Sequence, residues 1–252
     1  MTEVKEVATI EYGVRPPMFR PPRYIYYPES DGKPMAETDT HIKLLIYLRE
    51  ALADYFRDDP NVYVAGNLFV YYQEGDPSRV VAPDVFVVKG VPKRDRRIYQ
   101  VWKEDKGPDV VFELTSRSAQ REDLGPKKGI YEMLGVEEYF IFDPLGEYLE
   151  PRLVGFRLAE WGYRRIEGEE PLMSRVLGLE LRVEGEMLRL VDPATGEGLL
   201  TPLEAQEARR MEAEARRRAE QRAAEEAEAR RRAEAELERL RAELAHLRGE
   251  AA

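Results

Sequence analysis

Three residues in the middle of the chain carry side chains that could act on a phosphate group: Asp84, Glu113 and Lys127. Asp84 precedes the apolar run VFVV, and Glu113 lies inside the apolar run VVFEL. Burying an unpaired carboxylate is costly, so a cation must meet each acid. Paired carboxylates with open positions suit an oxygen-ligated Mg²⁺ or Mn²⁺ ion, which retains waters and accepts a substrate phosphate. The residues therefore predict a metal site within reach of Lys127.

A core salt bridge is the alternative for either acid, and for a single buried glutamate it would be the preferred interpretation. Two acids on consecutive strands, followed by a basic helix, favour the metal site instead. The deciding observation is whether Asp84 and Glu113 converge beside Lys127. An arginine paired with either acid would favour the alternative.

Composition limits the choice of metal ligands and partners. The chain of 252 residues has no cysteine and two histidines, His41 and His246, which excludes thiolate sites and histidine-rich metal sites. Its formal net charge of -10 argues against a general nucleic-acid coat. Binding to a polyanion would then need a local basic surface or a bound metal.

The elements that must position these residues follow from hydrophobic periodicity. Residues 40–56 have apolar side chains near helical spacing, with Thr38 or Asp39 as the cap. Further elements are predicted as strands over 61–75 (two short strands or one bent strand), 80–90, 108–116 and 137–144, a helix over about 125–134 with Pro126 in its first turn and Gly135 at its end, and a hairpin around Glu184-Gly185. This order predicts a mixed α/β domain with a helix on each face of a sheet.

Side-chain alternation assigns the candidate residues to faces of these elements. Asp84 shares a strand face with Phe86, and Glu113 shares one with Thr115. Lys127 is four residues from both Asp123 and Tyr131, so Lys127 and Tyr131 line one side of a helix. A short loop after the Glu113 strand would bring the start of that helix back over the strand ends.

The chain divides into three segments of different composition. Residues 1–34 are rich in Pro and Tyr and are expected to form an extended arm. Residues 35–200 contain the predicted sheet and form the domain. Residues 201–252 are dominated by Ala, Glu, Arg and Leu, and Glu repeatedly precedes Arg by four residues, which predicts a long helix.

The end of this helix carries a leucine seam. Leucines recur at spacings of three, four and three residues, at Leu237, Leu240, Leu244 and Leu247. This is the a/d pattern of a coiled coil, and it predicts a homodimer through the last two heptads. A single solvated helix is the alternative, because Ala and charged residues occupy the seam further upstream.

The chain resembles the bacterial Uma-two family of restriction-type endonucleases, which have a PD-(D/E)XK core, over roughly residues 35 to 200. The resemblance rests on an ordered series: Pro83-Asp84, then Glu113, then Asp123-x3-Lys127-x3-Tyr131, then Gly135-Val136-x-Glu138-Tyr139-Phe140-x-x-Asp143-Pro144. The Pro-Asp and Glu strands alone are weak signals. The ordered run from Glu113 to Pro144 is a much more specific signal.

The resemblance implies a Mg²⁺- or Mn²⁺-dependent endodeoxyribonuclease. Asp84 and Glu113 would be the metal ligands, and Lys127 would be the catalytic lysine. Thr115 stands where the general superfamily pattern has its lysine, so the lysine of this family has moved into the following helix. His41 on the first helix is a further candidate for the site, and a half-buried helix histidine is its alternative. Thr115, Asp123 and Tyr131 are the remaining accessory candidates.

Basic residues before and after the Glu113 strand could contact the DNA backbone, with a solvated loop as the alternative for the turn KGVPKRDRR. The candidates are Lys89, Lys93, Arg94, Arg96, Arg97, Arg117, Arg121 and Lys128. Lys128 points about 100° away from Lys127 on an α-helix and is therefore the weaker catalytic candidate.

No apolar stretch is long enough to cross a membrane, and the N-terminus lacks the features of a secretory signal, so a cytoplasmic location is predicted. Two rival functions remain. One is a nucleic-acid-binding protein that keeps the fold and cuts poorly. The other is an interaction module that oligomerises through the helical tail.

Overall fold

The first helix, α1 (Asp39–Tyr55), forms because apolar residues repeat at intervals of three and four and bury one face. The structure is a computed structural model that describes residues 25–30, 32, 38–116, 120–168 and 171–250. The Thr38 hydroxyl accepts a hydrogen bond from the backbone N–H of His41 at 3.2 Å, so Thr38 and not Asp39 is the N-cap. Leu44, Leu48 and Leu52 point inward from the helix.

The central sheet has the strand order β1-β4-β6-β7-β8-β9 in the described part of the chain. Its strands are β1 (Val62–Gly66), β4 (Val85–Lys89), β6 (Val110–Leu114), β7 (Glu138–Phe142), β8 (Leu153–Ala159) and β9 (Gly162–Arg165). Only β6 and β7 pair in parallel within this sheet. A parallel pair requires a crossover, and the helical segment before β7 supplies it.

Two smaller sheets complete the domain. The first consists of β10 (Leu172–Ser174), β11 (Leu179–Glu184) and β12 (Met187–Val191), and the second of β3 (Val80–Val81), β2 (Val70–Tyr71) and β5 (Tyr99–Gln100). Glu184 pairs with Met187 at the end of the β11–β12 ladder, which confirms the predicted hairpin. Gly66 ends β1 and Asn67 has φ 50°, so the predicted run 61–75 is two short strands.

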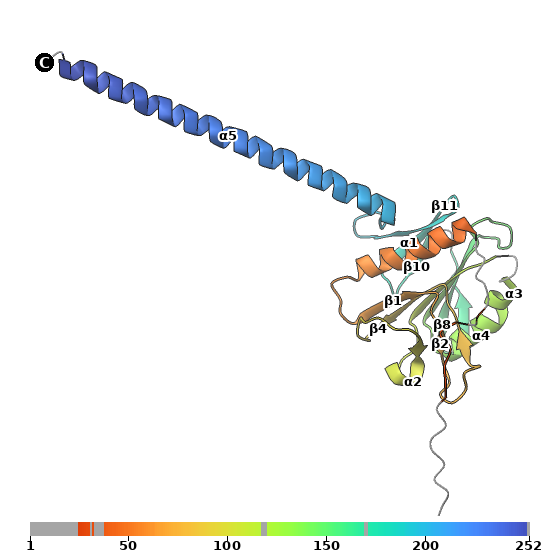
Figure 1. Cartoon of the computed structure of the whole chain (residues 1–252). Coiled ribbons are helices and arrows are strands. Elements are labelled where there is room, and N and C mark those ends of the chain that lie inside the picture. The colour runs from red at the N-terminus through yellow and green to blue at the C-terminus, as the bar shows by residue number, and fades with distance from the viewer. Residues whose placement is uncertain (1–24, 31, 33–37, 117–119, 169–170, 251–252) are drawn as a thin grey trace, which may run out of the picture.

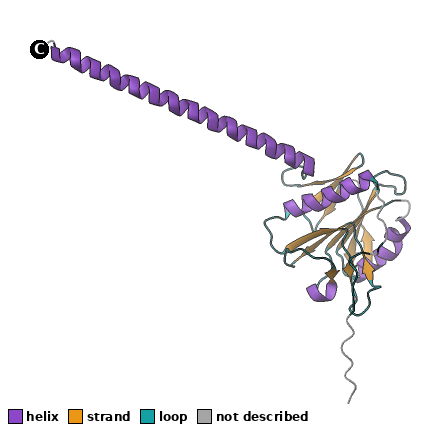
Figure 2. Ribbon diagram, viewed as in Figure 1, coloured by secondary structure: helices purple, strands orange, loops and turns teal. Residues whose placement is uncertain are grey.

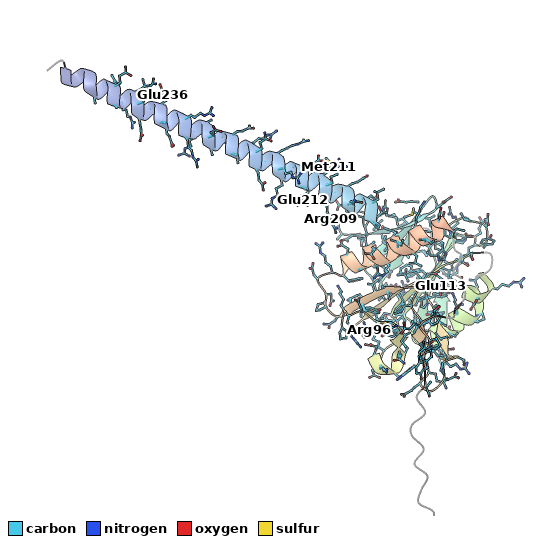
Figure 3. All side chains as sticks on the ribbon, viewed as in Figure 1. Arg96, Glu113, Arg209, Met211, Glu212 and Glu236 are labelled. Carbon is cyan, nitrogen blue, oxygen red and sulfur yellow. The ribbon has the colours of Figure 1, made fainter. Side chains whose placement is uncertain are left out.

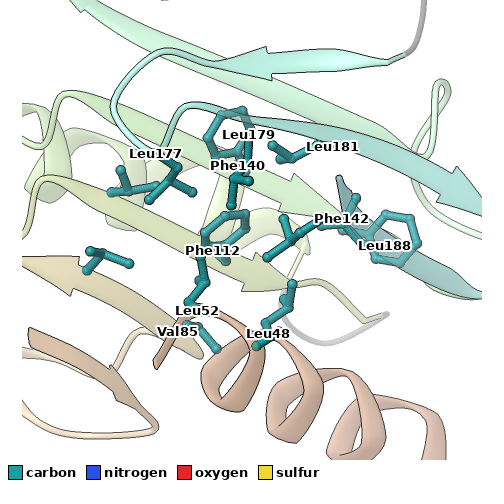
Figure 4. Close-up of a cluster of buried hydrophobic side chains, with 14 of the residues drawn as sticks. Leu48, Leu52, Val85, Phe112, Phe140, Phe142, Leu177, Leu179, Leu181 and Leu188 are labelled. Atoms are coloured by element: carbon teal, nitrogen blue, oxygen red, sulfur yellow. The ribbon is translucent and has the colours of Figure 1, made fainter. Parts of the chain in front are cut away.

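The central sheet separates two hydrophobic cores. On one face, Leu48 and Leu52 of α1 pack against Phe112 and Phe140, and the β10-β11-β12 sheet closes this core (Figure 4). On the other face, Phe86, Val111 and Tyr139 pack with Tyr131 of the crossover helix. The sheet is therefore covered by a helix on each face, as predicted (Figures 1 and 2).

Two predicted elements need correction. Residues 80–90 form two strands instead of one, because Ala82, Pro83 and Asp84 interrupt the run and proline cannot donate to a ladder. The helix predicted over 125–134 begins earlier, with α3 (Gln120–Glu122), a π-helical turn η1 (Asp123–Lys127) and α4 (Lys128–Met133).

The π-helical turn contains Pro126, so this proline is internal and not at the helix start. A proline inside a helix removes a backbone hydrogen bond and disturbs the α-helical ladder. The predicted end is confirmed, because Gly135 follows the helix with φ 73° in the left-handed region. Another short helix, α2 (Val101–Glu104), was not predicted.

The long C-terminal helix α5 (Pro202–Glu250) projects away from the domain (Figure 1). Its first turn is fastened to β12, since Arg189 forms an ion pair with Glu204 at 2.9 Å. Hydrogen bonds from Arg189 and from the Thr201 backbone lower the pKa of Glu204 to about 2. Among the described residues, no helix is both long and apolar enough to cross a membrane.

Part of the N-terminal arm lies against the domain. The ring of Tyr27 packs edge-on against Tyr71 at 5.0 Å and tilts toward Trp102 at 5.3 Å. The Tyr71 hydroxyl donates to the carbonyl of Pro28 at 2.6 Å. Residues 25–30 therefore lie against β2, whereas residues 1–24, 31 and 33–34 of the predicted arm lie outside the described residues.

Candidate active site

Glu113 lies near the C-terminal end of β6 with its side chain 2% exposed. Strand alternation places Phe112 and Leu114 in the core beneath α1, which turns Glu113 toward the opposite face. The α4 helix covers that opposite face, and its Tyr131 belongs to the second core, which lies there. A buried glutamate is therefore held between the central sheet and the crossover helix. Figure 3 labels Glu113 within the domain.

The crossover helix satisfies both carboxylate oxygens of Glu113. Lys127 Nζ donates to Glu113 Oε2 at 3.0 Å, and the Tyr131 hydroxyl donates to Glu113 Oε1 at 2.6 Å. The same ammonium group lies 3.0 Å from Asp123 Oδ1. The π-helical turn thus directs Asp123 and Lys127 into one buried cluster with Glu113.

Asp84 lies beside Glu113 at the start of β4. The β4–β6 register pairs Val85 with Phe112, and one further step of that register sets Asp84 opposite Glu113. The Leu114 backbone N–H donates to Asp84 Oδ2 at 2.7 Å, and His41 Nε2 lies 3.2 Å from Asp84 Oδ1. His41 of α1 therefore faces the site. Of the two alternatives for His41, a site residue or a half-buried helix histidine, the structure favours the first.

Burial and like charge dominate the electrostatics of the cluster. Burial raises the pKa of Glu113, the charge of Asp84 raises it further, and Lys127 only partly offsets both. Burial likewise raises the pKa of Asp123 against the opposing effect of Lys127. Burial alone would lower the pKa of Lys127, but the charges of Glu113 and Asp123 outweigh it and raise that pKa. Lys127 is accordingly a fixed cation at neutral pH.

Among the described residues, neither Asp84 nor Glu113 pairs with an arginine, so the core salt bridge with arginine that was the alternative is not found. Glu138 on β7 provides the contrast. It is fully buried, and Arg157 pairs with it at 2.8 Å while Ser174 donates to it. Glu138 thus forms a core salt bridge with an arginine. Asp84 and Glu113 instead face one histidine and one lysine.

The residues present are chemically compatible with a divalent cation. Within the described ranges, no group of three or more His, Asp or Glu side chains forms a ready metal cage. Mg²⁺ needs only one or two carboxylates, since water and substrate fill its other positions. Asp123 Oδ2 and the Thr115 hydroxyl are buried without a hydrogen bond of good geometry among the described residues, whereas Asp123 Oδ1 already faces the Lys127 ammonium at 3.0 Å. Such unsatisfied oxygens beside the adjacent acids Asp84 and Glu113 suit an added cation.

The basic residues of the predicted DNA contact do not form one surface. Arg96 is buried, pairs with Glu104 at 2.9 Å and covers the Tyr63 ring, so it does not face solvent. Lys93 Nζ donates to the carbonyls of Phe56 and Arg57 after the end of α1.

Other predicted contacts differ in exposure. Lys89 Nζ donates to the Val176 carbonyl, and Lys128 Nζ lies 4.1 Å from the centre of the Phe156 ring. Arg94 and Arg97 are exposed, although each has an acidic partner, Glu104 and Glu29 respectively. Arg121 is exposed on α3, and Arg117 lies outside the described residues.

Sequence reasoning missed a groove of about 380 Å³ along the edge strand β1. Its basic lining includes Arg49 of α1 with Lys93, Arg94 and Arg96. The groove reaches Gly66, whose α-carbon lies so close to the Asp84 carbonyl that an added Cβ would sit 3.0 Å from that oxygen. Arg49 is eight residues after His41 on the same helix. This spacing could have indicated from the sequence that Arg49 lies on the same side of the helix as His41.

The mixed sheet, its covering helices and the Asp-Glu-Lys cluster define a restriction-endonuclease-like protein. The family model Uma2, described as "Putative restriction endonuclease", matches residues 12–184, and the chain belongs to this family. The match confirms the resemblance seen in the sequence. It begins within the N-terminal arm and ends before α5.

One solved structure similar to the chain is a putative nuclease belonging to DUF820 from Anabaena variabilis. It has a TM-score of 0.42 and 13% sequence identity, and the similarity covers 57% of this chain and 76% of that one. No curated protein matches the chain.

Proposed function

We propose that this chain is a divalent-metal-dependent endonuclease that hydrolyses phosphodiester bonds in DNA. The observation that carries the proposal is the buried cluster in which Lys127 Nζ lies 3.0 Å from both Glu113 and Asp123, next to Asp84. Membership of the Uma2 family supports the nuclease class. A structural salt bridge would need one acid for one base, whereas this cluster holds an excess of acids.

Asp84 and Glu113 are the residues that would hold Mg²⁺ or Mn²⁺. When bound, the ion would polarise the phosphodiester and lower the pKa of a coordinated water. Lys127 is a cation throughout the neutral range, so it stabilises negative charge on the phosphate or orients the water and does not act as a base. The two roles are complementary, because both place positive charge where the transition state becomes more negative.

The remaining contacts hold these groups in position. Tyr131 fixes one oxygen of Glu113, and Asp123 is a second acidic partner that holds Lys127 in place. His41 and the Leu114 amide fix the two oxygens of Asp84. A catalytic group held by several neighbours loses little entropy when substrate binds, which favours reaction.

DNA would reach the cluster along the β1 groove. The groove contains the exposed arginines Arg49 and Arg94, and its lining includes Gly66, which lies close to the Asp84 carbonyl. A chain with net charge -10 requires such a local basic path to approach a phosphate backbone. Arg97 extends the basic surface, with its side chain 83% exposed.

A cleavage assay tests the proposal. Supercoiled, linear, single-stranded and branched DNA are incubated with Mg²⁺ or Mn²⁺ and the wild type, Glu113→Ala or Lys127→Ala. Lys43→Ala is the matched control, since Lys43 is an exposed lysine on α1 outside the cluster. We expect metal-dependent cutting by the wild type and the control and none by the two cluster variants.

Other outcomes contradict the proposal in different ways. Cutting that survives both cluster substitutions would place the active site elsewhere or indicate a contaminant. Binding of DNA without metal and without cutting, unchanged by either substitution, would support a nucleic-acid-binding module on the same fold. Circular dichroism of each variant separates loss of activity from loss of folding.

A further inference from the structure

The distal end of α5 presents a row of leucines to solvent. Leu237, Leu240 and Leu244 are 49%, 48% and 55% exposed, although leucine is usually buried. Their spacing of three and then four residues assigns Leu237 and Leu244 to a positions of a heptad and Leu240 to a d position. In sequence, Leu247 continues the same register as the next d position.

The charged residues that flank this row identify its partner. The g positions before each a residue are Glu236 and Glu243, and the e positions after each d residue are Arg241 and Arg248. In a parallel pair of identical helices, each g residue faces the e residue five positions further along the other helix. Glu236 would then face Arg241 of the second copy, and Glu243 would face Arg248 of the second copy.

The opposite orientation is disfavoured by the same residues. In an antiparallel pair, g residues face g residues and e residues face e residues. Glutamate would then oppose glutamate, and arginine would oppose arginine, along the seam. We propose that α5 binds a second copy of this chain through a parallel two-stranded coiled coil formed by its last two heptads.

Charge also limits how far the pairing extends toward the domain. Continued upstream, the a positions fall on Arg230 and Arg216, and a d position falls on Glu226. Each of these would meet an identical charge in a parallel dimer, so the helices separate there. Arg216 and Arg230 instead pair within their own helix, with Glu220 at 2.8 Å and Glu234 at 2.9 Å.

The dimer would therefore have two separate arms that join at their C-terminal ends. At about 1.5 Å per residue, the arm from Pro202 to the start of the leucine row is about 50 Å long. A parallel pair puts both domains at the same end of the coil. If the domains are nucleases, as proposed above, two active sites could then engage one DNA duplex at separate points.

Light scattering of the full chain tests the pairing. We expect a mass of twice 29.1 kDa for the wild type. Leu240→Lys puts a charge on the seam and should halve that mass. Met211→Lys is the matched control, because Met211 is 66% exposed on the same helix but outside the seam (Figure 3). Lysine is a good helix former, so both variants should keep α5 helical.

Disulfide formation tests the orientation, because the chain has no cysteine of its own. Leu244→Cys should form a covalent dimer under mild oxidation, since identical a positions face each other only in a parallel coil. A mixture of Leu237→Cys and Leu247→Cys chains carrying tags of different size should form no mixed disulfide, because this a position and this d position face each other only in an antiparallel coil. Mixed disulfides would show an antiparallel pair.

A monomeric wild type, or equal masses for all three chains in light scattering, would overturn the proposal. A partner helix from another protein would also leave the purified chain monomeric. Neither measurement depends on DNA cleavage. The dimer and the nuclease proposal can therefore fail independently of each other.

Discussion

Tyr131 of the crossover helix donates its hydroxyl hydrogen to Glu113 Oε1 over 2.6 Å, and both side chains are buried. This bond favours the charged form of Glu113 and so opposes the rise in pKa that burial and Asp84 impose. Tyr131 is therefore a positioning residue, which keeps the carboxylate both oriented and ionisable.

Tyr131→Phe is expected to slow cleavage about tenfold at neutral pH, because a hydrogen bond to a charged group contributes about 1.5 kcal/mol or more. The pKa of Glu113 rises further without the hydroxyl, so the acid limb of the pH–rate profile should move to higher pH. A rate loss with an unmoved acid limb would assign Tyr131 a packing role alone.

Glu113→Gln is expected to stabilise the fold while removing activity. The folded-state pKa of Glu113 is raised, so the stability that this group contributes is present at low pH and is lost as pH rises. Glutamine stays neutral, and the thermal midpoint at neutral pH should rise by about 2–4 °C, the effect of about 1 kcal/mol in a chain of this size. The difference should shrink as pH falls and Glu113 takes up a proton.

Glu138→Gln is the control for this stability measurement. Glu138 is equally buried on the neighbouring strand, but Arg157 neutralises it at 2.8 Å. Its replacement leaves the partly buried Arg157 without its charge partner and should destabilise the fold. Equal effects of the two substitutions would contradict the excess of negative charge inferred around Lys127.

Lys127→Ala is expected to reduce the rate by about 10²- to 10³-fold, the usual cost of losing one preorganised electrostatic group. Because Glu113 and Asp123 hold Lys127 in its charged form, the wild-type rate should show no loss from lysine deprotonation up to about pH 10. Rates measured across the alkaline range check this. An alkaline limb near neutral pH that vanishes in Lys127→Ala would identify Lys127 as a base instead.

Much of this site could be predicted from the sequence, because successive side chains of a strand point to opposite faces of the sheet. The VVFEL run alone indicates that Glu113 faces away from Phe112 and Leu114, and the structure confirms it. The spacing of Lys127 and Tyr131 correctly indicated a shared helix face, since both side chains meet Glu113.

Other features depend on long-range contacts that no local pattern contains. The π-helical turn at 123–127 has no periodic signal, and Pro126 favoured a helix start there. The basic turn around Arg96 looked solvent-exposed because its acidic partner, Glu104, belongs to the unpredicted helix α2. A buried ion pair can be predicted only when the positions of both the basic and the acidic residue are known.

Arg96→Met is expected to act on folding and not on DNA. Arg96 is 3% exposed, pairs with Glu104 and lies 4.2 Å from the centre of the Tyr63 ring. Breaking a buried pair by removing one partner costs about 3 kcal/mol, which a urea titration would measure. Arg97→Ala is the control, with its side chain 83% exposed, and should leave stability unchanged. If the Arg96→Met variant folds but binds DNA more weakly, Arg96 is part of the DNA-binding surface after all.

Arg49→Ala is expected to weaken DNA binding without changing the fold. Arg49 is exposed on α1, lines the β1 groove and contacts its neighbour Glu50, a surface pair that contributes little to stability. One lost phosphate contact should reduce the slope of log affinity against log salt by about one. Fluorescence anisotropy of labelled DNA at several salt concentrations measures this slope. Arg182→Ala, on β11 outside the groove, is the control, and an equal effect there would show that only total charge matters.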